Sequence, residues 1–283
     1  MSRLASVALI VLASAPGSAQ VFRTSTDVVS VNVTVRAGRS PVRGLTSADF
    51  ELLDNGVRQT IDAISIEEIP IDLTLVLDTS GSTAAVIDRF KAGAHGLSAM
   101  LRPRDRVRLI SVSTMVVEIF GLTPAGLPLP VEGLQARGTT SLHDALLLSL
   151  ARPSPEGRRQ LVIAFTDGFD TTSILPGQGL VAAASRSDAA LHIVLAGGVG
   201  LPPTMRSLRA AAEVSGGELY TRAEFADVTE AFRSVFDDFR QSYVLQYTLA
   251  GVDRRGWHDL TVNLTKALGR RYTLRSRRGY FGG

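Results

Sequence analysis

Three short segments of this chain place oxygen-bearing side chains where hydrophobic runs give way to loops. They read Asp78-Thr79-Ser80-Gly81-Ser82, Gly138-Thr139-Thr140 and Thr166-Asp167-Gly168. Together they offer carboxylates and hydroxyls, and the chain contains no cysteine. Hard oxygen ligands of this kind suit Mg2+, Mn2+ or Ca2+ better than zinc. The residue types therefore predict a site for a hard divalent cation.

The loop that follows Asp78 has the spacing that such a cation needs. Ser80 and Ser82 lie two residues apart after the apolar run 71–77, so both hydroxyls can face the point that Asp78 flanks. An ion held in this way has neutral oxygen ligands close in, and the carboxylates need touch it only through water. Such an ion keeps much of its Lewis acidity, and a carboxylate from outside can complete its octahedral shell.

The other two segments are expected at the same place in the fold. Asp167 follows a strand predicted over 160–165, and Thr140 lies in the loop before a helix that begins near Leu142. In an open α/β sheet, ligands bind outside the carboxyl ends of the strands. If the strands 71–77 and 160–165 are neighbours, all three loops meet at one edge of the sheet.

The region 70–240 alternates strand and helix patterns. The predicted strands cover 71–77, 106–112, 115–120, 160–165, 191–196 and 218–220. The predicted helices cover 82–101 (capped by Ser82 or Thr83), 142–151, 179–186, 204–214 and 224–240. This alternation indicates an α/β fold with an open, mostly parallel, doubly wound sheet and right-handed crossovers.

Both ends of the chain are instead β-rich. Strands are predicted over 27–36, 50–53 and 57–66, the last two joined by the hairpin turn Asp54-Asn55-Gly56, and over 242–249, 257–265 and 271–277. A three-stranded fragment alone has exposed edges and a poor core. We therefore expect one small β-sandwich built from 20–69 and 241–283, with the α/β domain 70–240 inserted. Two separate β extensions are the alternative.

Composition limits the class of protein. The chain has 283 residues, enough for two cores, with 45% hydrophobic and 20% charged residues and a formal net charge of +3. An arginine cluster near the C-terminus alternates with other residues, which favours the solvent face of an edge strand over a nucleic-acid patch: Arg270, Arg271, Arg275, Arg277 and Arg278. No Gly-x-x-x-x-Gly-Lys loop occurs, so no nucleotide is expected.

The N-terminal segment has the features of a secretory signal. A basic start at Arg3 precedes a short apolar run over 4–15, and Gly17-Ser18-Ala19 supplies small residues before Gln20. The run is too short to cross a hydrocarbon core of about 30 Å. We expect residues 1–19 to be removed near Ala19-Gln20 and the protein to be secreted, periplasmic or associated with the cell envelope. A membrane anchor that stays attached is the alternative.

The three segments together resemble the metal-ion-dependent adhesion site (MIDAS) of von Willebrand factor type A (VWA) domains. The order of strands, motifs and helices agrees from about Ile71 to Arg240. The flanking Gly44-Leu45-Thr46-x-x-Asp49-Phe50 and Arg278-Gly279-Tyr280 resemble a bacterial exported subfamily described as "VWFA-related". The resemblance implies metal ligation by Asp78, Ser80, Ser82, Thr140 and Asp167, with the two serine hydroxyls as direct ligands.

Two details of the resemblance bear on the Thr140 loop. Thr140 takes the family's threonine position because Leu142 follows two residues later, and Thr139 is the fallback. Arg137 stands where the family commonly has a second glycine, which alters the path of the loop or places a cation beside the site.

Three functions are compatible with these residues. The first is a non-catalytic, exported module that uses the cation to grip an Asp or Glu of a partner protein. The second is a structural or assembly protein of the envelope with a vestigial metal site. The third is a serine hydrolase built on Ser80 or Ser82 with His143 and Asp167, which lacks the Gly-x-Ser-x-Gly elbow. Asp170, Thr171 and Thr172 are expected either at the border of the site or in a loop that is capped by its own side chains.

Overall fold

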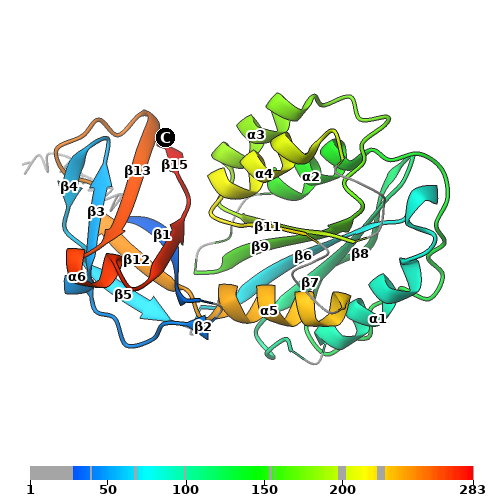
Figure 1. The fold of residues 1–283 in the computed structure, drawn as a ribbon, viewed down its shortest axis with the longest axis horizontal. Helices are drawn as coiled ribbons and strands as arrows, with labels where there is room; N and C mark the ends of the chain where they lie inside the picture. Colours follow the sequence, from blue (N-terminus) through cyan, green and yellow to red (C-terminus); the bar gives the residue numbers. More distant parts are fainter. Residues whose placement is uncertain are drawn as a thin grey trace, which may run out of the picture.

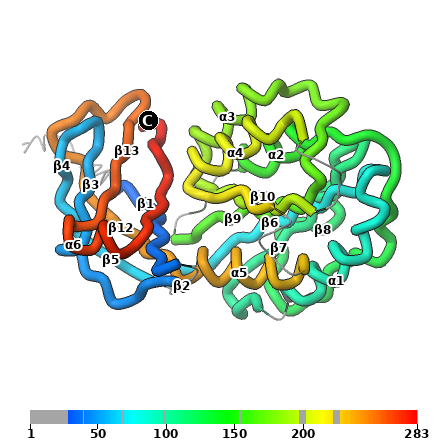
Figure 2. Tube along the Cα trace, viewed as in Figure 1, coloured from blue at the N-terminus to red at the C-terminus, as the bar shows by residue number. Residues whose placement is uncertain are grey.

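The computed structural model describes residues 28–38, 40–66, 69–98, 100–152, 155, 157–196, 202–221 and 227–282. The predicted signal segment 1–19 and its cleavage point lie outside these residues. The described chain forms an α/β domain beside a β-sandwich (Figure 1). Helix α5 runs along the α/β domain, ends at the junction and leads into strand β12 of the sandwich (Figure 2).

The central sheet has six strands in the order β11-β10-β9-β6-β7-β8. Their bounds are β6 Ile71–Asp78, β7 Arg106–Val112, β8 Val116–Pro124, β9 Arg159–Thr166, β10 Ala190–Leu195 and β11 Leu219–Tyr220. Only β8 runs antiparallel to its neighbour among these pairs. Every residue of β6 and of β9 is buried, as expected for apolar strands covered on both faces. The predicted mostly parallel sheet is confirmed.

Helices cover both faces of this sheet (Figure 1). One apolar layer includes residues of α1 (Ile87–Ser98) and α5 (Val228–Arg240), with Phe165 of β9 between Phe90 and Phe232. The other layer includes α2 (Leu142–Leu150), α3 (Gly177–Arg186) and α4 (Met205–Val214). The part of α5 predicted over 224–226 lies outside the described residues.

The first helix begins later than predicted. Residues Gly81–Thr83 form a 3-10 turn instead, and α1 starts at Ile87. The hydroxyl of Thr83 donates to the carbonyls of Asp78 and Ser80, at 3.0 and 2.8 Å, which holds the chain in a tight turn. Thr83 therefore stabilises the loop after β6 rather than capping a helix.

Strands from both ends of the chain form the sandwich. One sheet has the order β14-β1-β12-β5, with β2 (Ser40–Pro41) paired to β1, and contains β14 Thr273–Ser276, β1 Val28–Ala37, β12 Tyr243–Thr248 and β5 Ala63–Ile66. The other has the order β15-β13-β3-β4, with β15 Gly279–Gly282, β13 Gly256–Leu264, β3 Phe50–Asp54 and β4 Val57–Gln59. The short helices η1 (Ser47–Asp49) and α6 (Lys266–Gly269) complete it.

The predicted single strand 57–66 is wrong. Its first part, β4, pairs with β3 in one sheet, and its last part, β5, pairs with β12 in the other. The crossing is held by Asp62, whose N–H donates to Gln246 O at 2.8 Å and whose carboxylate accepts from the N–H of Thr248 at 2.6 Å. Strand β15 was also missed by the sequence prediction.

A buried polar cluster links the two sheets of the sandwich. Asp54 of β3 and His258 of β13 are both fully buried, with His258 Nδ1 2.7 Å from Asp54 Oδ1. Tyr247 of β12 and Tyr280 of β15 donate their hydroxyls to Asp54 Oδ2 at 2.6 and 2.9 Å. Because Tyr247 comes from the opposite sheet, its hydrogen bond ties the two sheets together.

Two of the C-terminal arginines, Arg275 and Arg277, lie between the two parts of the molecule, so their prediction as a solvent face is wrong, whereas Arg270, Arg271 and Arg278 are exposed as predicted. Arg275 pairs with Glu218, and Arg277 pairs with Asp188 at 3.0 Å; their side chains are 21% and 11% exposed. The backbone also approaches closely here. A Cβ added at Gly216, which has φ +83°, would lie 2.7 Å from Arg277 N. The edge of the sandwich therefore packs against the central domain, where Glu218 and Asp188 pair with its arginines.

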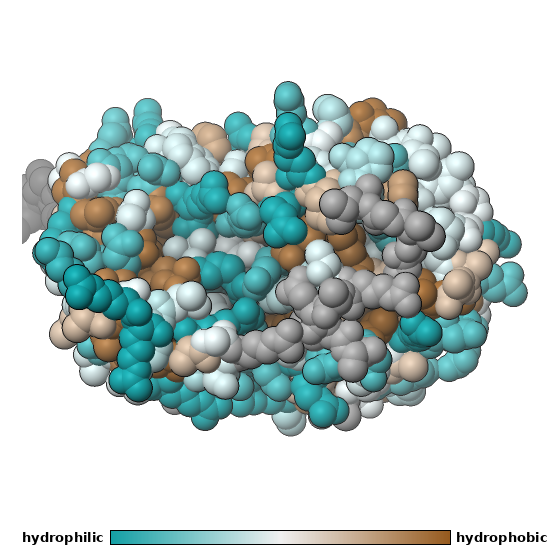
Figure 3. Space-filling view, viewed as in Figure 1, coloured by the Kyte–Doolittle hydropathy of each residue, from teal (hydrophilic) through white to brown (hydrophobic). Residues whose placement is uncertain are grey.

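The outer surface is mixed in character. On the face in Figure 3, hydrophilic and hydrophobic side chains are interspersed over both parts of the molecule. Within the described ranges, no helix is long and apolar enough to span a membrane.

Candidate metal site

The structure brings the first and third predicted segments together. Strands β6 and β9 are adjacent, with Leu77 opposite Phe165, so Asp78 and Asp167 leave neighbouring strands at the same sheet edge. Asp78 is fully buried and Asp167 is 3% exposed. Two carboxylates therefore lie close together in a place shielded from water.

Hydrogen bonds fix both oxygens of Asp78. Its Oδ1 accepts the N–H of Ser80 at 2.9 Å, and its Oδ2 accepts the hydroxyl of Thr166 at 2.6 Å. The Thr166 hydroxyl in turn accepts the N–H of Gly168 at 2.9 Å. Thr166 thus orients Asp78 from the neighbouring strand, a role that the sequence motif contains but that sequence reasoning did not assign.

The serine hydroxyls lie side by side. Ser80 Oγ is 3.1 Å from Ser82 Oγ, as expected from their spacing of two residues in a tight turn. Ser80 is 1% exposed whereas Ser82 is exposed, so this pair of neutral oxygen donors leads from the buried end of the loop to the surface.

Asp167 has one oxygen without a partner. Its Oδ1 accepts the N–H of Phe169 at 3.1 Å, whereas Oδ2 is buried and makes no hydrogen bond. Burial raises the pKa of Asp78 to about 6, and the nearby charge of Asp167 adds to this rise against the hydrogen bonds from Ser80 and Thr166. A buried carboxylate oxygen without a partner is costly unless a cation compensates it.

The Thr140 loop is clamped to the loop after β6. Gly81 N–H donates to Gly138 O at 3.0 Å, and Arg137 N–H donates to Thr79 O at 2.8 Å. Gly138 is needed here because its φ is +77° and an added Cβ would lie 2.4 Å from Thr114 Oγ1. The second segment therefore joins the other two at the sheet edge.

Thr140 is itself 2% exposed and held by the loop that follows Asp167. Its N–H donates to Thr171 Oγ1 at 2.9 Å, and its carbonyl accepts from Thr171 N and Thr172 N at 2.9 and 3.0 Å. Thr171 and Thr172 thus support the Thr140 loop by direct hydrogen bonds.

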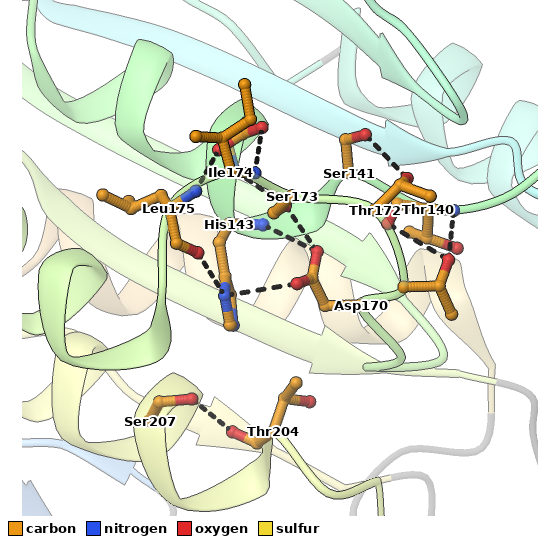
Figure 4. A network of polar contacts seen from close by, with 12 residues as sticks. Thr140, Ser141, His143, Asp170, Thr172, Ser173, Ile174, Leu175, Thr204 and Ser207 are labelled. Atoms are coloured by element: carbon orange, nitrogen blue, oxygen red, sulfur yellow. Dashed lines mark hydrogen bonds and ion pairs between the residues drawn. The ribbon is translucent and has the colours of Figure 1, made fainter.

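The loop 170–175 is pinned onto the start of α2 (Figure 4). Asp144, in the first turn of α2, accepts the N–H groups of Ile174 and Leu175, each at 2.9 Å. His143 Nδ1 lies 3.1 Å from Leu175 O and 3.4 Å from Asp170 Oδ2. His143 therefore faces this loop, and no contact with Ser80 or Ser82 occurs within the described part of the chain.

The donor set fits a hard divalent cation. It consists of two carboxylates and several hydroxyls, with an orphaned buried oxygen on Asp167. No group of three or more His, Cys, Asp or Glu side chains suited to a metal occurs in the ranges that the structure describes. A site of the softer, histidine-rich kind is therefore not present among them.

Comparison with solved structures identifies the architecture. A von Willebrand factor type A protein from Catenulispora acidiphila matches with a TM-score of 0.50 and 12% sequence identity, over 83% of this chain and 74% of that chain. The central domain has the von Willebrand factor type A fold. No family model and no curated protein matches the sequence.

Two other solved structures match this chain with lower TM-scores. An aerotolerance-related membrane protein from Bacteroides fragilis, carrying mutations to serine, matches with a TM-score of 0.46 and 18% identity, over 60% of this chain and 98% of that one. Proximal thread matrix protein 1 from the mussel byssus, with a zinc-occupied MIDAS motif, matches with a TM-score of 0.48 and 15% identity, over 64% and 48% of the two chains.

Proposed function

We propose that the protein is a non-catalytic binding module that captures an acidic residue of a partner protein through a divalent cation. The ligands would be Asp78, Ser80, Ser82, Thr140 and Asp167, and Mg2+, with Mn2+ or Ca2+ as alternatives, would be the ion. The observation that carries the proposal is the buried Oδ2 of Asp167, which has no hydrogen-bond partner beside a second buried carboxylate.

The chemistry of the donors explains the choice of ligand. When bound, the ion supplies a positive charge in a partly dehydrated cup. Thr166 and the Ser80 N–H hold Asp78 in place, and the adjacent serine hydroxyls are neutral donors that leave the charge of the ion largely uncompensated. A carboxylate from a partner is the natural ligand for that remaining charge.

The proposal also includes export of the protein from the cytosol. The basic start, the apolar run and the small residues before Gln20 support removal of residues 1–19 and a secreted, periplasmic or envelope location. The test is the intact mass of the protein recovered from the envelope fraction. A mature chain that begins near Gln20 supports export with cleavage, and a full-length mass in the cytosol contradicts it.

The alternatives differ in what they require of the site. An envelope assembly protein with a vestigial site would keep its partners after chelation with EDTA. A serine hydrolase would need His143 near Ser80 or Ser82, but His143 instead contacts Leu175 and Asp170. Labelling by a serine-directed phosphonate would support the hydrolase, and its absence agrees with a binding module.

Calorimetric titration with Mg2+, Mn2+ and Ca2+ tests the metal site. Asp78→Ala and Ser80→Ala should each weaken ion binding strongly, because they remove a charge and a neutral donor from the same cup. Asp253→Ala is the matched control, since Asp253 is exposed on the sandwich. Equal ion binding by Asp78→Ala and the wild type would defeat the proposal.

A further inference from the structure

The loops around the candidate site carry one exposed cation and two exposed apolar side chains. Arg137 is exposed, Met115 is 68% exposed and Ile174 is 93% exposed. We call these three residues the rim. Hydrogen bonds join the loops that carry them, from Thr139 Oγ1 to Thr114 Oγ1 and between Ser141 Oγ and Thr172 Oγ1, both at 3.0 Å, so the three residues lie on adjoining loops beside the site.

Backbone hydrogen bonds hold Arg137 next to the loop that contains Ser80 and Ser82. Its N–H donates to Thr79 O, and the next residue, Gly138, accepts the N–H of Gly81, which lies between Ser80 and Ser82. Among the described residues, the side chain of Arg137 makes no hydrogen bond or ion pair. The backbone is therefore fixed, while the guanidinium stays free to contact a ligand.

The two apolar residues are also fixed through their neighbours. Ile174 N–H donates to the Asp144 carboxylate at 2.9 Å, and in Figure 4 its side chain points away from the polar network. Met115 closes a turn by accepting the N–H of Ser113 at 3.0 Å. Thr114, in the same turn, accepts the N–H of Thr139 at 3.1 Å. Exposure of these side chains therefore does not come from an unanchored loop.

We propose that the rim selects the partner segment, which carries a second carboxylate for Arg137 and an apolar side chain for Ile174 and Met115, next to the acid that reaches the ion. This inference rests on the proposed function. An Arg guanidinium binds carboxylates in a planar, two-pronged geometry. Charge complementarity thus favours an acidic, partly apolar peptide over a lone acidic residue.

A random dodecapeptide phage library tests the proposal with the full mature chain loaded with Mg2+. Phage released by EDTA should be enriched in sequences with two acidic residues close together and a neighbouring apolar residue. Released peptides that share a single acid, without a second acid or an apolar neighbour, overturn the inference but keep the proposed function. The absence of any EDTA-released phage contradicts the proposed function itself.

Substitutions then assign each contact, with a selected peptide measured by fluorescence polarisation. Arg137→Ala should weaken binding about fivefold at low salt and less at high salt, and Arg137→Lys should recover part of the loss. Ile174→Ser should weaken it roughly tenfold through lost apolar contact. Unchanged affinity in Arg137→Ala and Ile174→Ser overturns the inference.

Matched controls lie far from the rim. Arg255 is an exposed arginine on the sandwich, and Leu127 is 53% exposed beyond β8, whose last residue pairs with the first residue of β7 at the opposite end of the sheet. Arg255→Ala and Leu127→Ser should leave peptide affinity unchanged. If they weaken it as much as the rim variants, the effect is not local and the inference fails.

Discussion

The substitution Asp78→Asn should make the metal-free protein more stable at pH 7 and abolish its response to divalent cations. Asp78 is fully buried, and burial raises its pKa from 3.8 to about 6. One pKa unit corresponds to about 1.4 kcal/mol. The charged carboxylate therefore costs the metal-free folded state about 3 kcal/mol relative to the unfolded chain.

The sign of the pH dependence follows from the two pKa values. Below pH 3.8, the carboxyl is protonated in both states and the penalty is absent; the penalty grows as the pH rises and is complete above about 6. Asparagine removes the charge but loses one acceptor, so the bond from Thr166 is broken at a cost of about 1 kcal/mol. The net gain at pH 7 is about 2 kcal/mol, or a Tm increase of roughly 4–8 °C.

Thermal and urea unfolding in EDTA, followed by circular dichroism from pH 4 to pH 8, measures this gain. The advantage of the variant should shrink on acidification and reverse near pH 4, where only the lost hydrogen bond remains. In Mg2+ at a hundredfold excess over its Kd, the wild type should gain about 2.7 kcal/mol and the variant nothing. If the variant is equally destabilised at pH 4 and pH 7 in EDTA, the reasoning from burial is refuted.

Three further substitutions test the scaffold around the site. Gly138→Ala should destabilise the protein by about 1–3 kcal/mol in urea and weaken Mg2+ binding in calorimetry, because Gly138 has φ +77° and no room for a Cβ beside Thr114. Asp105→Asn should cost about 3–5 kcal/mol, since it leaves the Arg240 guanidinium buried without its carboxylate; a loss below 1 kcal/mol in urea would contradict this. Tyr247→Phe should cost about 1–3 kcal/mol by removing a hydrogen bond to a buried carboxylate, with unchanged Mg2+ affinity as the sign that the sandwich alone is affected.

The local parts of the fold could be predicted from the sequence because short, contiguous residue patterns determine them. The unbroken apolar run 71–77 predicts a strand buried on both faces, and β6 is buried throughout. Asp78 and Asp167 were expected where two strands end, and they leave adjacent strands. The hydroxyls of Ser80 and Ser82 lie 3.1 Å apart, because residues two apart in a tight turn bring their side chains close together. Metal ligation by these residues stays a prediction.

Features that depend on distant parts of the chain could not be predicted. The strand pattern 57–66 has no internal break, and its division between two sheets depends on Asp62 meeting Gln246 and Thr248. The alternating pattern around Arg275 is the same for an exposed edge strand and for one that another domain covers, so the ion pair with Glu218 could not be foreseen. Thr166 is an ordinary strand residue by type, and only the neighbouring strand shows that it orients Asp78.

The position of β1 imposes an order on how the chain can fold when its N-terminal part becomes available first. In its sheet, β1 lies between β12 and β14, and its contact with β2 is only two residues long. The strands of the central sheet all lie between Ile71 and Tyr220, so that sheet can close before β12 and β14, the long partners of β1, are available. Until then, the valines at 31, 33 and 35 lack the part of their apolar cluster that β12 and β13 supply, and a chain truncated before β12 would leave them partly open to proteases and to other unfolded chains.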